Sequence, residues 1–354
     1  GEQLPLAFAF LYDNRVPAGT MLLVSRSVAI LMTLLLGASL ALWTKRRFGA
    51  PAALLALFLF TTDPNIAAHG RLATTDLPVT LFFWLAVTAW GGYVVEKRPR
   101  DLVLAGLATG LALLSKFSAA LLLPVFAILY LCRAWQEGEA PPLAKSLSVE
   151  RFFASMLAVA LLCALLILPV YGMRMHAPLP LSMTVDAETD SGRALATLAR
   201  AVHLPDHPFL AGLFLVAQHA AMGHSAYLLG QLSTTGWWRY YPVAFLVKTP
   251  TAVLLLLACS LAALVAAAMP SRLRRLRELP FCWLVLAVPV MTYFGAAMAT
   301  SLNIGLRHLL PIYPFLFVFA AAAALRAAAR LGRARPYLLA GVILIQTVEA
   351  ASIY

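Results

Sequence analysis

The sequence has few charged residues for its length. Asp, Glu, Lys and Arg make up 12% of its 354 residues, whereas soluble domains carry about 25%. Hydrophobic residues make up 62%, and the mean hydropathy is +0.84. So few charged side chains cannot cover a water-exposed surface, and this excludes a soluble enzyme and a disordered protein.

Cysteine is also scarce. The four cysteines all lie in apolar runs without CxxC spacing; they are Cys132, Cys163, Cys259 and Cys282. This excludes a disulfide scaffold and favours small packing residues. The motifs GxxxxGK[ST], HExxH, GxSxG and GxGxxG are absent as well, so nucleotide hydrolysis, zinc proteolysis and dinucleotide chemistry have no support.

Long apolar runs recur along the whole chain, and many are long enough to cross the roughly 30 Å hydrocarbon core of a bilayer. We therefore predict an all-α, polytopic membrane protein with about ten transmembrane helices. The spans are expected at residues 21–43, 50–61, 77–95, 102–114, 117–131, 152–171, 241–269, 281–300, 308–329 and 337–353.

Basic residues are concentrated in every second loop between these spans. Five loops expected to be cytoplasmic hold 17 of the 27 Lys and Arg residues, at 45–47, 97–100, 133–151, 272–277 and 326–335. This distribution follows the positive-inside rule. It explains most of the net charge of +12, so the charge does not indicate nucleic-acid binding. It also predicts a chain reversal at Ser115-Lys116, because one span fewer would place the last two basic loops outside.

We treat residues 1–354 as a single transmembrane domain with an outer loop at about 172–240. This loop includes an amphipathic piece at 190–203 and an apolar piece at 209–222, which we expect to lie along the membrane as interfacial helices. The chain opens in the middle of a loop without Met and stops where a span ends. We therefore expect a fragment that is truncated at both ends.

Four cations on the outer side are not explained by the positive-inside rule. Arg71, Lys116, Lys248 and Arg307 lie beside proline-broken helix ends. Each could simply anchor a helix by reaching the headgroup layer. Four cations at one membrane face nevertheless favour a phosphate ligand, since a lipid-linked phosphate lies at that level and arginine suits its oxygens.

A carboxylate occurs among these cations in the segment NIAAHGRLATTDLP. Asp76 follows Arg71 by five positions and His69 by seven. A carboxylate at membrane level is a candidate functional group. The alternative is a helix N-cap, because Asp76 precedes Leu77-Pro78. A cap can also be catalytic, so both interpretations stay open here.

Aromatic residues are concentrated around Arg239, just before the seventh predicted span. Interfacial aromatic belts explain two or three of them. We predict that the others, together with two histidines of the outer side, contact substrate. The residues predicted to bind substrate are His69, Tyr227, Trp237, Trp238, Tyr241 and His308.

Four segments carry a family resemblance. In chain order they are AHGRLATTDLPVTLFFWLA, GLATGLALLSKFSAALLLP, YLLGQLSTTGWWRYYPVAFLVKTP and NIGLRHLLPIYP. They resemble the polyprenyl-phosphate-sugar-dependent glycosyltransferases of the protein O-mannosyltransferase type. These enzymes belong to the GT-C membrane superfamily, which also includes the lipid A aminoarabinose transferases.

The resemblance implies inverting transfer of a sugar from a polyprenyl phosphate to a protein, lipid or glycan hydroxyl at the outer membrane face. Asp76 matches the family's second acidic position and Arg71 the arginine ahead of it, so both are expected to be catalytic. Lys116, Lys248 and Arg307 match recurring basic positions and are expected to bind the donor phosphate. The family's principal base lies in the first outer loop, which we expect this chain to lack.

We expect no cofactor, because the lipid-linked sugar is a substrate; no metal site is predicted, although a divalent metal stays open. The expected partners are the bilayer, the polyprenyl-phosphate sugar donor and the hydroxyl acceptor, and not nucleic acid. The alanine- and arginine-rich composition favours a bacterial inner membrane, with the site facing the periplasm or exterior. The alternatives are a transporter or flippase of lipid-linked sugars, for which inverted repeats would be typical, and a non-catalytic membrane scaffold.

Overall fold

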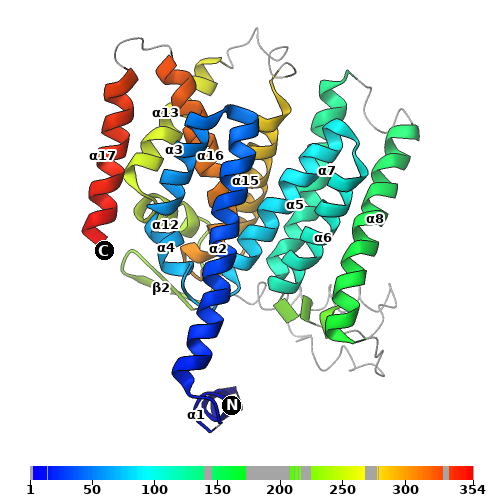
Figure 1. Ribbon diagram of the computed structural model, residues 1–354, viewed down its shortest axis with the longest axis vertical. Coiled ribbons are helices and arrows are strands. Elements are labelled where there is room, and N and C mark those ends of the chain that lie inside the picture. The colour runs from blue at the N-terminus through cyan, green and yellow to red at the C-terminus, as the bar shows by residue number, and fades with distance from the viewer. Residues whose placement is uncertain are drawn as a thin grey trace.

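A bundle of helices with one short hairpin makes up the computed structural model (Figure 1). The residues that it describes are 3–13, 15–138, 146–172, 208–210, 212–213, 215–216, 225–267, 277, 279–329 and 335–353. The first elements are α1 (Gln3–Tyr12), α2 (Ala18–Phe48), α3 (Ala50–Thr61), α4 (Pro64–His69), α5 (Asp76–Glu96), α6 (Pro99–Ser115), the 3-10 helix η1 (Phe117–Leu121), α7 (Leu122–Gln136) and α8 (Ser146–Tyr171). The later ones are β1 (Ala226–Leu228), β2 (Gln231–Ser233), α12 (Tyr240–Lys248), α13 (Thr251–Ala267), α15 (Phe281–Ala299), the 3-10 helix η3 (Leu306–Ile312), α16 (Tyr313–Ala329) and α17 (Arg335–Ile353).

Six helical segments in the described part of the chain are long and apolar enough to cross a membrane. They are Ala18–Phe48, Asp76–Glu96, Phe117–Gln136, Val149–Tyr171, Phe281–Ala299 and Leu306–Ala329. The pair α12 and α13 adds a seventh if the two are counted as one bent span, and α3 is a shorter apolar helix. The polytopic all-α membrane architecture is therefore confirmed, whereas the expected count of ten spans is not.

The continuous span predicted at 241–269 is wrong. The helix breaks after α12 ends at Lys248, and α13 starts at Thr251 with its axis turned by 117°. Pro250 has no N–H and disfavours helical geometry in the residue before it. Thr249 is accordingly extended, with φ −89° and ψ 135°. Lys248 is thus the last residue of a short helix rather than a residue inside a span.

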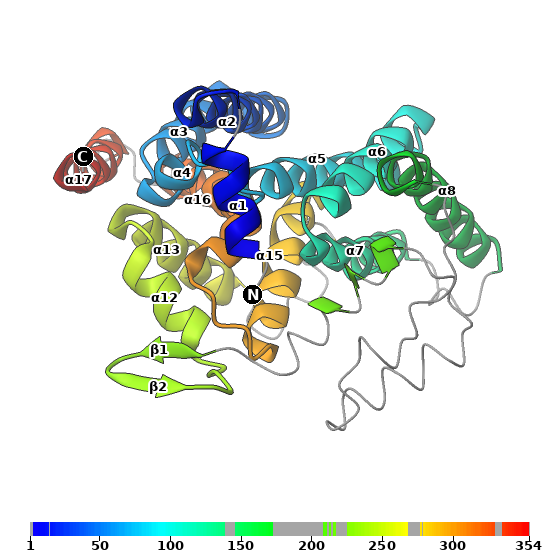
Figure 2. The ribbon, with the colours of Figure 1, turned by 90° about the horizontal axis from the view of Figure 1, so that it is seen from below.

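The centre of the bundle is formed by α5 and α16. In their most apolar stretches 61% and 78% of the residues are buried, against 17% in α2 and 22% in α8. Seen along the bundle, α2, α8 and α17 lie at its periphery (Figure 2). The outer side of α8 exposes leucines at a spacing of four, Leu157, Leu161 and Leu165. Such a continuous apolar surface is typical of contact with lipid.

Two glycines of α6 allow α8 to approach closely. A Cβ atom on Gly106 would lie 2.5 Å from Leu162 Cδ1, and one on Gly110 would lie 3.2 Å from Cys163 Cα. The Cys163 thiol also donates to the Gly106 carbonyl at 3.6 Å. Small residues four positions apart are typical of tight helix contacts in membranes.

The predicted reversal at Ser115-Lys116 is confirmed. Helix α6 ends at Ser115, Lys116 is extended with φ −161°, and α7 runs back alongside α5 (Figure 1). Trp90 of α5 and Phe126 of α7 hold the two helices together, because their rings stack at 4.6 Å and Trp90 Nε1 donates to the Phe126 carbonyl at 3.0 Å.

The described parts of the loops that were expected to be cytoplasmic lie at one end of the bundle. Arg47 after α2 pairs with Glu96 of α5 at 3.6 Å, and Gln136 of α7 donates to the Leu279 carbonyl at 2.9 Å. We call this the basic end. The opposite end, which contains α4, the start of α5 and the hairpin, is called the site end (Figure 1).

Most of the outer loop predicted at about 172–240 lies outside the described residues, as do the piece at 190–203 and most of the piece at 209–222. The described part contains the antiparallel hairpin of β1 and β2, in which Tyr227 pairs with Leu232. Its turn residues Leu229 and Gly230 have φ values of 48° and 86°, as a type I′ turn requires. This hairpin is an addition to the predicted all-α fold.

Candidate functional site

The site end is organised around the first turn of α5. Asp76 is the first residue of this helix and is 4% exposed. Lys116 Nζ lies 2.8 Å from Asp76 Oδ1. The ion pair therefore joins the start of α5 to the reversal after α6, and the helix dipole adds to the stabilisation of a negative charge at this position.

The structure does not place Asp76 at the N-cap of α5, and its catalytic role stays a prediction. The N-cap position of α5 is occupied by Thr75, whose side chain makes no capping hydrogen bond. The backbone carbonyl of Asp76 accepts from Thr80 Oγ1 at 2.6 Å, while its carboxylate faces Lys116. The carboxylate thus takes part in an ion pair rather than in a cap.

Several charged side chains act on His69, the last residue of α4. Asp76, Lys116, Lys248 and Arg307 all act electrostatically on its imidazole. Burial lowers the pKa of His69, and the three cations lower it further, while Asp76 opposes them. The imidazole is therefore neutral at pH 7. Asp76 and the three cations predicted to bind the donor phosphate thus all act on the same imidazole.

Arg307 and His308 lie together at the start of η3. The His308 ring is 5.7 Å from the ring of Tyr241 and 5.8 Å from that of Tyr293, as centroid distances. The charges of Lys116, Asp76 and Arg307 also act on His308. Two tyrosine rings therefore pack beside this imidazole, on which the Asp76–Lys116 pair also acts electrostatically.

Both histidines carry an unused polar atom. The Nδ1 atoms of His69 and His308 are buried, and neither has a hydrogen-bond partner in the described part of the chain. Buried polar atoms in native proteins are nearly always hydrogen-bonded. The hydrogen-bonding capacity of these two nitrogens is therefore not satisfied by the described residues.

A hydrogen bond to its backbone carbonyl connects Lys248 to α4. Its carbonyl accepts from Asn65 Nδ2 at 2.8 Å, which links α12 to α4. The side chains of Lys248 and Arg307 are exposed, and neither forms an ion pair with a described residue. Three cations and the single carboxylate of Asp76 leave a local surplus of two positive charges.

Trp237 and Tyr241 are attached to the segment that leads into η3. The Trp237 backbone N–H donates to Asn303 Oδ1 at 2.7 Å, and the Tyr241 hydroxyl donates to the Leu302 carbonyl at 2.5 Å. The aromatic segment before α12 is thereby joined to the segment that carries Arg307.

Three predicted site residues lie apart from this cluster. Arg71 is exposed and lines a groove of about 300 Å³ between α2, α3 and α4. Tyr227 and Trp238 are 64% and 67% exposed. Their predicted roles therefore stay predictions.

Three further polar residues of the site were not predicted. Tyr293 lies within the apolar run of α15, where nothing in the sequence marks it, and its hydroxyl donates to Ser118 Oγ at 3.1 Å. Asn65 and Asn303, in contrast, begin the segments NIAAHGRLATTDLP and NIGLRHLLPIYP. Because each amide group occurs in a short segment that also contains histidine and arginine, both asparagines could have been predicted as site residues from the sequence.

The described residues contain no group of three or more His, Cys, Asp or Glu side chains that could hold a metal ion. That the protein needs no cofactor stays a prediction.

Comparison with known families supports the resemblance. Residues 18–171 match the family model described as dolichyl-phosphate-mannose-protein mannosyltransferase. This stretch includes Asp76 and Lys116, and the matched family is one of glycosyltransferases, as the motifs predict. A comparison with curated proteins finds no match.

Among solved structures, the chain is similar to the crystal structure of ArnT from Cupriavidus metallidurans bound to undecaprenyl phosphate. The TM-score is 0.54 and the sequence identity is 17%; the match covers 85% of this chain and 46% of ArnT. The chain therefore spans about half the length of that protein. The likeness confirms the predicted GT-C-like membrane fold.

Proposed function

We propose that the site end binds the phosphate of a polyprenyl-phosphate sugar and that the protein transfers this sugar to a hydroxyl of a protein, lipid or glycan. The observation that carries the proposal is that the buried Asp76 pairs with Lys116, and that this pair, Lys248 and Arg307 all act on the imidazole of His69. The match of residues 18–171 to a mannosyltransferase family and the undecaprenyl phosphate in the ArnT crystal structure support the same ligand class.

The charge of the cluster suits the leaving group better than the donor. A sugar-phosphate diester carries one negative charge, whereas the polyprenyl phosphate that leaves approaches two. A surplus of two positive charges is therefore complementary to the charge that develops during the reaction. Arg307 offers a planar fork for two phosphate oxygens, while Lys116 and Lys248 act as point charges.

The proposed reaction needs one acid–base group. The acceptor oxygen forms a bond to the anomeric carbon with inversion, while the bond between this carbon and the phosphate oxygen breaks. The phosphate leaves with the electron pair, and we assign the proton of the acceptor hydroxyl to Asp76 as general base, in place of the base in the first outer loop that the resemblance implies. Lys116 contacts Oδ1, so we assign the proton to Oδ2.

The two histidines of the site end are suited to hold the sugar. The Nδ1 atoms of His69 and His308, which have no hydrogen-bond partner among the described residues, would accept hydrogen bonds from sugar hydroxyls. The loops of the basic end follow the positive-inside rule. We therefore place the site at the periplasmic or external face of a bacterial inner membrane.

The test compares three variants of the full-length protein in detergent with a polyprenyl-phosphate sugar as donor. We expect Asp76→Asn to lower transfer about 100-fold or more and Lys248→Ala to lower kcat/KM for the donor about tenfold. Arg239→Ala removes an exposed cation outside the cluster and should retain the parent rate.

Transfer at the parent rate by both Asp76→Asn and Lys248→Ala would overturn the site assignment. Absence of transfer by the parent protein, together with passage of the donor across liposome membranes, would support the transporter or flippase instead.

A further inference from the structure

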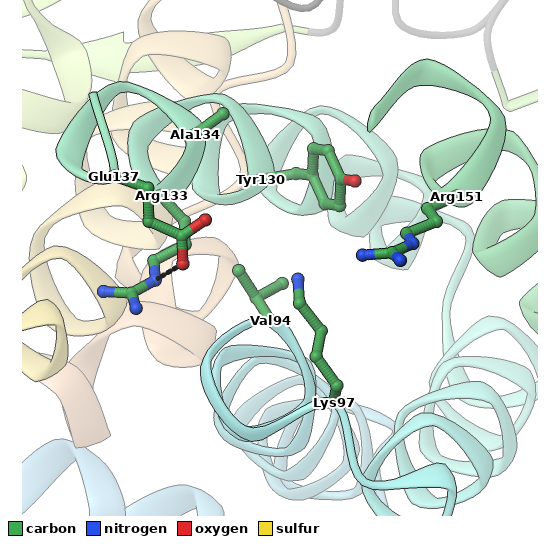
Figure 3. Close-up of a pocket in the computed structure, with 7 residues that line it drawn as sticks. All are labelled: Val94, Lys97, Tyr130, Arg133, Ala134, Glu137 and Arg151. Carbon is green, nitrogen blue, oxygen red and sulfur yellow. Dashed lines mark ion pairs between the residues drawn. The ribbon is translucent and has the colours of Figure 1, made fainter. Parts of the chain in front are cut away.

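The position of Lys248 depends on its backbone rather than on its side chain. The side chain is exposed and pairs with no carboxylate in the described part of the chain. Arg133 at the basic end differs, because its guanidinium pairs with Glu137 one turn later at 2.8 Å (Figure 3). The place of the Lys248 ammonium is therefore set by how firmly the end of α12 is fixed.

The end of α12 is fixed to α4 by the side chain of Asn65. The last carbonyls of a helix have no partner within the helix, and Lys248 is the last residue of α12. Its carbonyl accepts from Asn65 Nδ2 at 2.8 Å, and 183 positions separate the two residues in the chain. A helix end that would otherwise depend on water is thus bonded to a second element of the protein.

Asn65 is itself held by the start of α4. Asp63 is the N-cap of this helix and accepts the Asn65 N–H at 2.8 Å, and Pro64 occupies the first helical turn. Proline suits this position, because its φ is already that of a helix. His69 follows Asn65 by four positions, so both lie on one face of α4. That face carries the amide that binds the Lys248 backbone and the imidazole on which the Lys248 charge acts.

Two further bonds fix the residues that follow Lys248. Thr249 Oγ1 and the hydroxyl of Tyr313, the first residue of α16, are 2.7 Å apart, and both residues are buried. The Thr251 N–H donates to Glu349 Oε2 of α17 at 2.8 Å. The break between α12 and α13 is therefore held by α4, α16 and α17, and the bond from α4 is the one made to Lys248.

We propose that Asn65 is a positioning residue for the sugar donor, which acts through Lys248 by keeping its ammonium where the donor phosphate binds. This inference rests on the proposed function, because it takes Lys248 as a ligand of the phosphate. Without the Asn65 amide, water would bond the Lys248 carbonyl and the end of α12 would be less restricted. The phosphate would then have to order the lysine as it binds, which costs affinity.

A double-mutant cycle on the full-length protein in detergent tests the proposal. It measures kcat/KM for a polyprenyl-phosphate sugar in the parent, Asn65→Ala, Lys248→Ala and the double variant. We expect Asn65→Ala to lower kcat/KM about fivefold, the effect of one neutral hydrogen bond. In the Lys248→Ala background the same substitution should change kcat/KM less than about twofold, because no ammonium is left to position.

Gln136→Ala is the matched control. Gln136 Nε2 donates to the Leu279 carbonyl at 2.9 Å, a bond of the same kind at the basic end. This variant should keep the kcat/KM of the parent. Thermal unfolding of Asn65→Ala and Gln136→Ala should show small losses of similar size, so that a difference in kcat/KM between them does not reflect folding.

The same loss from Asn65→Ala with and without Lys248 would overturn the proposal, since Asn65 would then act independently of the lysine. A parent-like kcat/KM in Asn65→Ala, or an equal loss in Gln136→Ala, would also overturn it. A parent-like kcat/KM in Lys248→Ala is a different result: it would overturn the phosphate role of Lys248 in the proposed function, and the positioning by Asn65 with it.

Discussion

Lys116 Nζ lies 2.8 Å from Asp76 Oδ1, although 40 positions separate the two residues in the chain. The side chain of Asp76 is 6% exposed and that of Lys116 is 24% exposed. The carboxylate is therefore the more buried partner. The negative charge of Asp76 is therefore stabilised mainly by the ion pair. The ammonium of Lys116 is also solvated, because water reaches the lysine to an appreciable extent.

Loss of Lys116 should therefore destabilise the protein more than neutralisation of Asp76. Lys116→Met leaves a buried carboxylate unpaired, which costs on the order of 2 kcal/mol. Asp76→Asn leaves an ammonium that water can still solvate, and we expect a loss of about 1 kcal/mol. The double variant should regain part of the loss of Lys116→Met. Thermal unfolding in detergent measures all three, and equal losses in the two single variants would contradict the argument.

Arg307 should contribute to donor binding by its shape as well as its charge. Arg307→Lys keeps the charge but loses the fork that suits two phosphate oxygens. We expect kcat/KM for the donor to fall about tenfold in Arg307→Lys and about 100-fold in Arg307→Gln. Steady-state kinetics with varied donor measures this, with Arg239→Gln as the control. An unchanged kcat/KM in Arg307→Gln would remove Arg307 from the donor site.

Helix positions could be predicted from the sequence where long apolar runs end at charged or turn-forming residues. The span predicted at 281–300 is found as α15, and the segment predicted at 50–61 is found as the helix α3 with the same bounds, although α3 is shorter than a membrane-spanning helix. The break at Pro250 was missed, because the apolar residues on both sides of it form one long run. The backbone restriction of one proline decided the geometry there.

The members of the site could be predicted in part, but not their pairing. Loop parity placed Asp76 and Lys116 on one side of the membrane, whereas their contact depends on how α5 and α6 pack. Tyr293 was not found, because its neighbours His308 and Ser118 come from other helices. Nothing in an apolar run marks the one residue that faces a distant polar group.

Asp63 should make the stability depend on pH in an unusual direction. Its Oδ1 accepts the backbone N–H groups of Asn65 at 2.8 Å and Ile66 at 3.0 Å, while Oδ2 is buried without a partner among the described residues. Burial raises the pKa of Asp63 to about 6, against the opposing effect of the two N–H groups. The folded state therefore holds a proton that the unfolded chain loses near pH 4, and stability falls as the pH rises from about 4 to 6.

Asp63→Asn keeps a capping oxygen but cannot ionise. We expect it to be more stable than the parent at pH 8, by up to about 3 kcal/mol for a shift of about two pKa units. The difference should shrink toward pH 4. Thermal unfolding of both proteins at the two pH values tests this, and a difference that does not change with pH would contradict it.

Gly236 should be required for the contact between the aromatic segment and η3. Its φ is 70°, and a Cβ atom would lie 2.6 Å from Asn303 Oδ1 and 2.7 Å from the Ser301 carbonyl. Gly236→Ala would displace Asn303, which accepts the Trp237 N–H. We expect a loss of about 1–3 kcal/mol. Gly230→Ala is the control in thermal unfolding, because Gly230 also has a positive φ but nothing within 4 Å, and similar losses would argue against a steric cause.

A larger residue in place of Gly106 should disrupt the packing of α6 against α8. A Cβ atom there would lie 2.5 Å from Leu162 Cδ1, a flexible end, but also 2.9 Å from Leu162 Cβ, which cannot move without the backbone of α8. Gly106→Val should therefore separate the helices and lower the stability by about 1–3 kcal/mol.

Leu162→Ala in the same chain should restore part of the stability lost in Gly106→Val, since it removes the atoms that clash. Gly295→Val makes the same substitution within α15, where nothing lies within 4 Å of the added Cβ, and it should change the unfolding midpoint less. Two results would contradict a steric cause: Leu162→Ala does not relieve the stability loss of Gly106→Val, or Gly295→Val lowers the stability as much. Either would show that the low helix propensity of valine, rather than the close approach of α8, causes the loss.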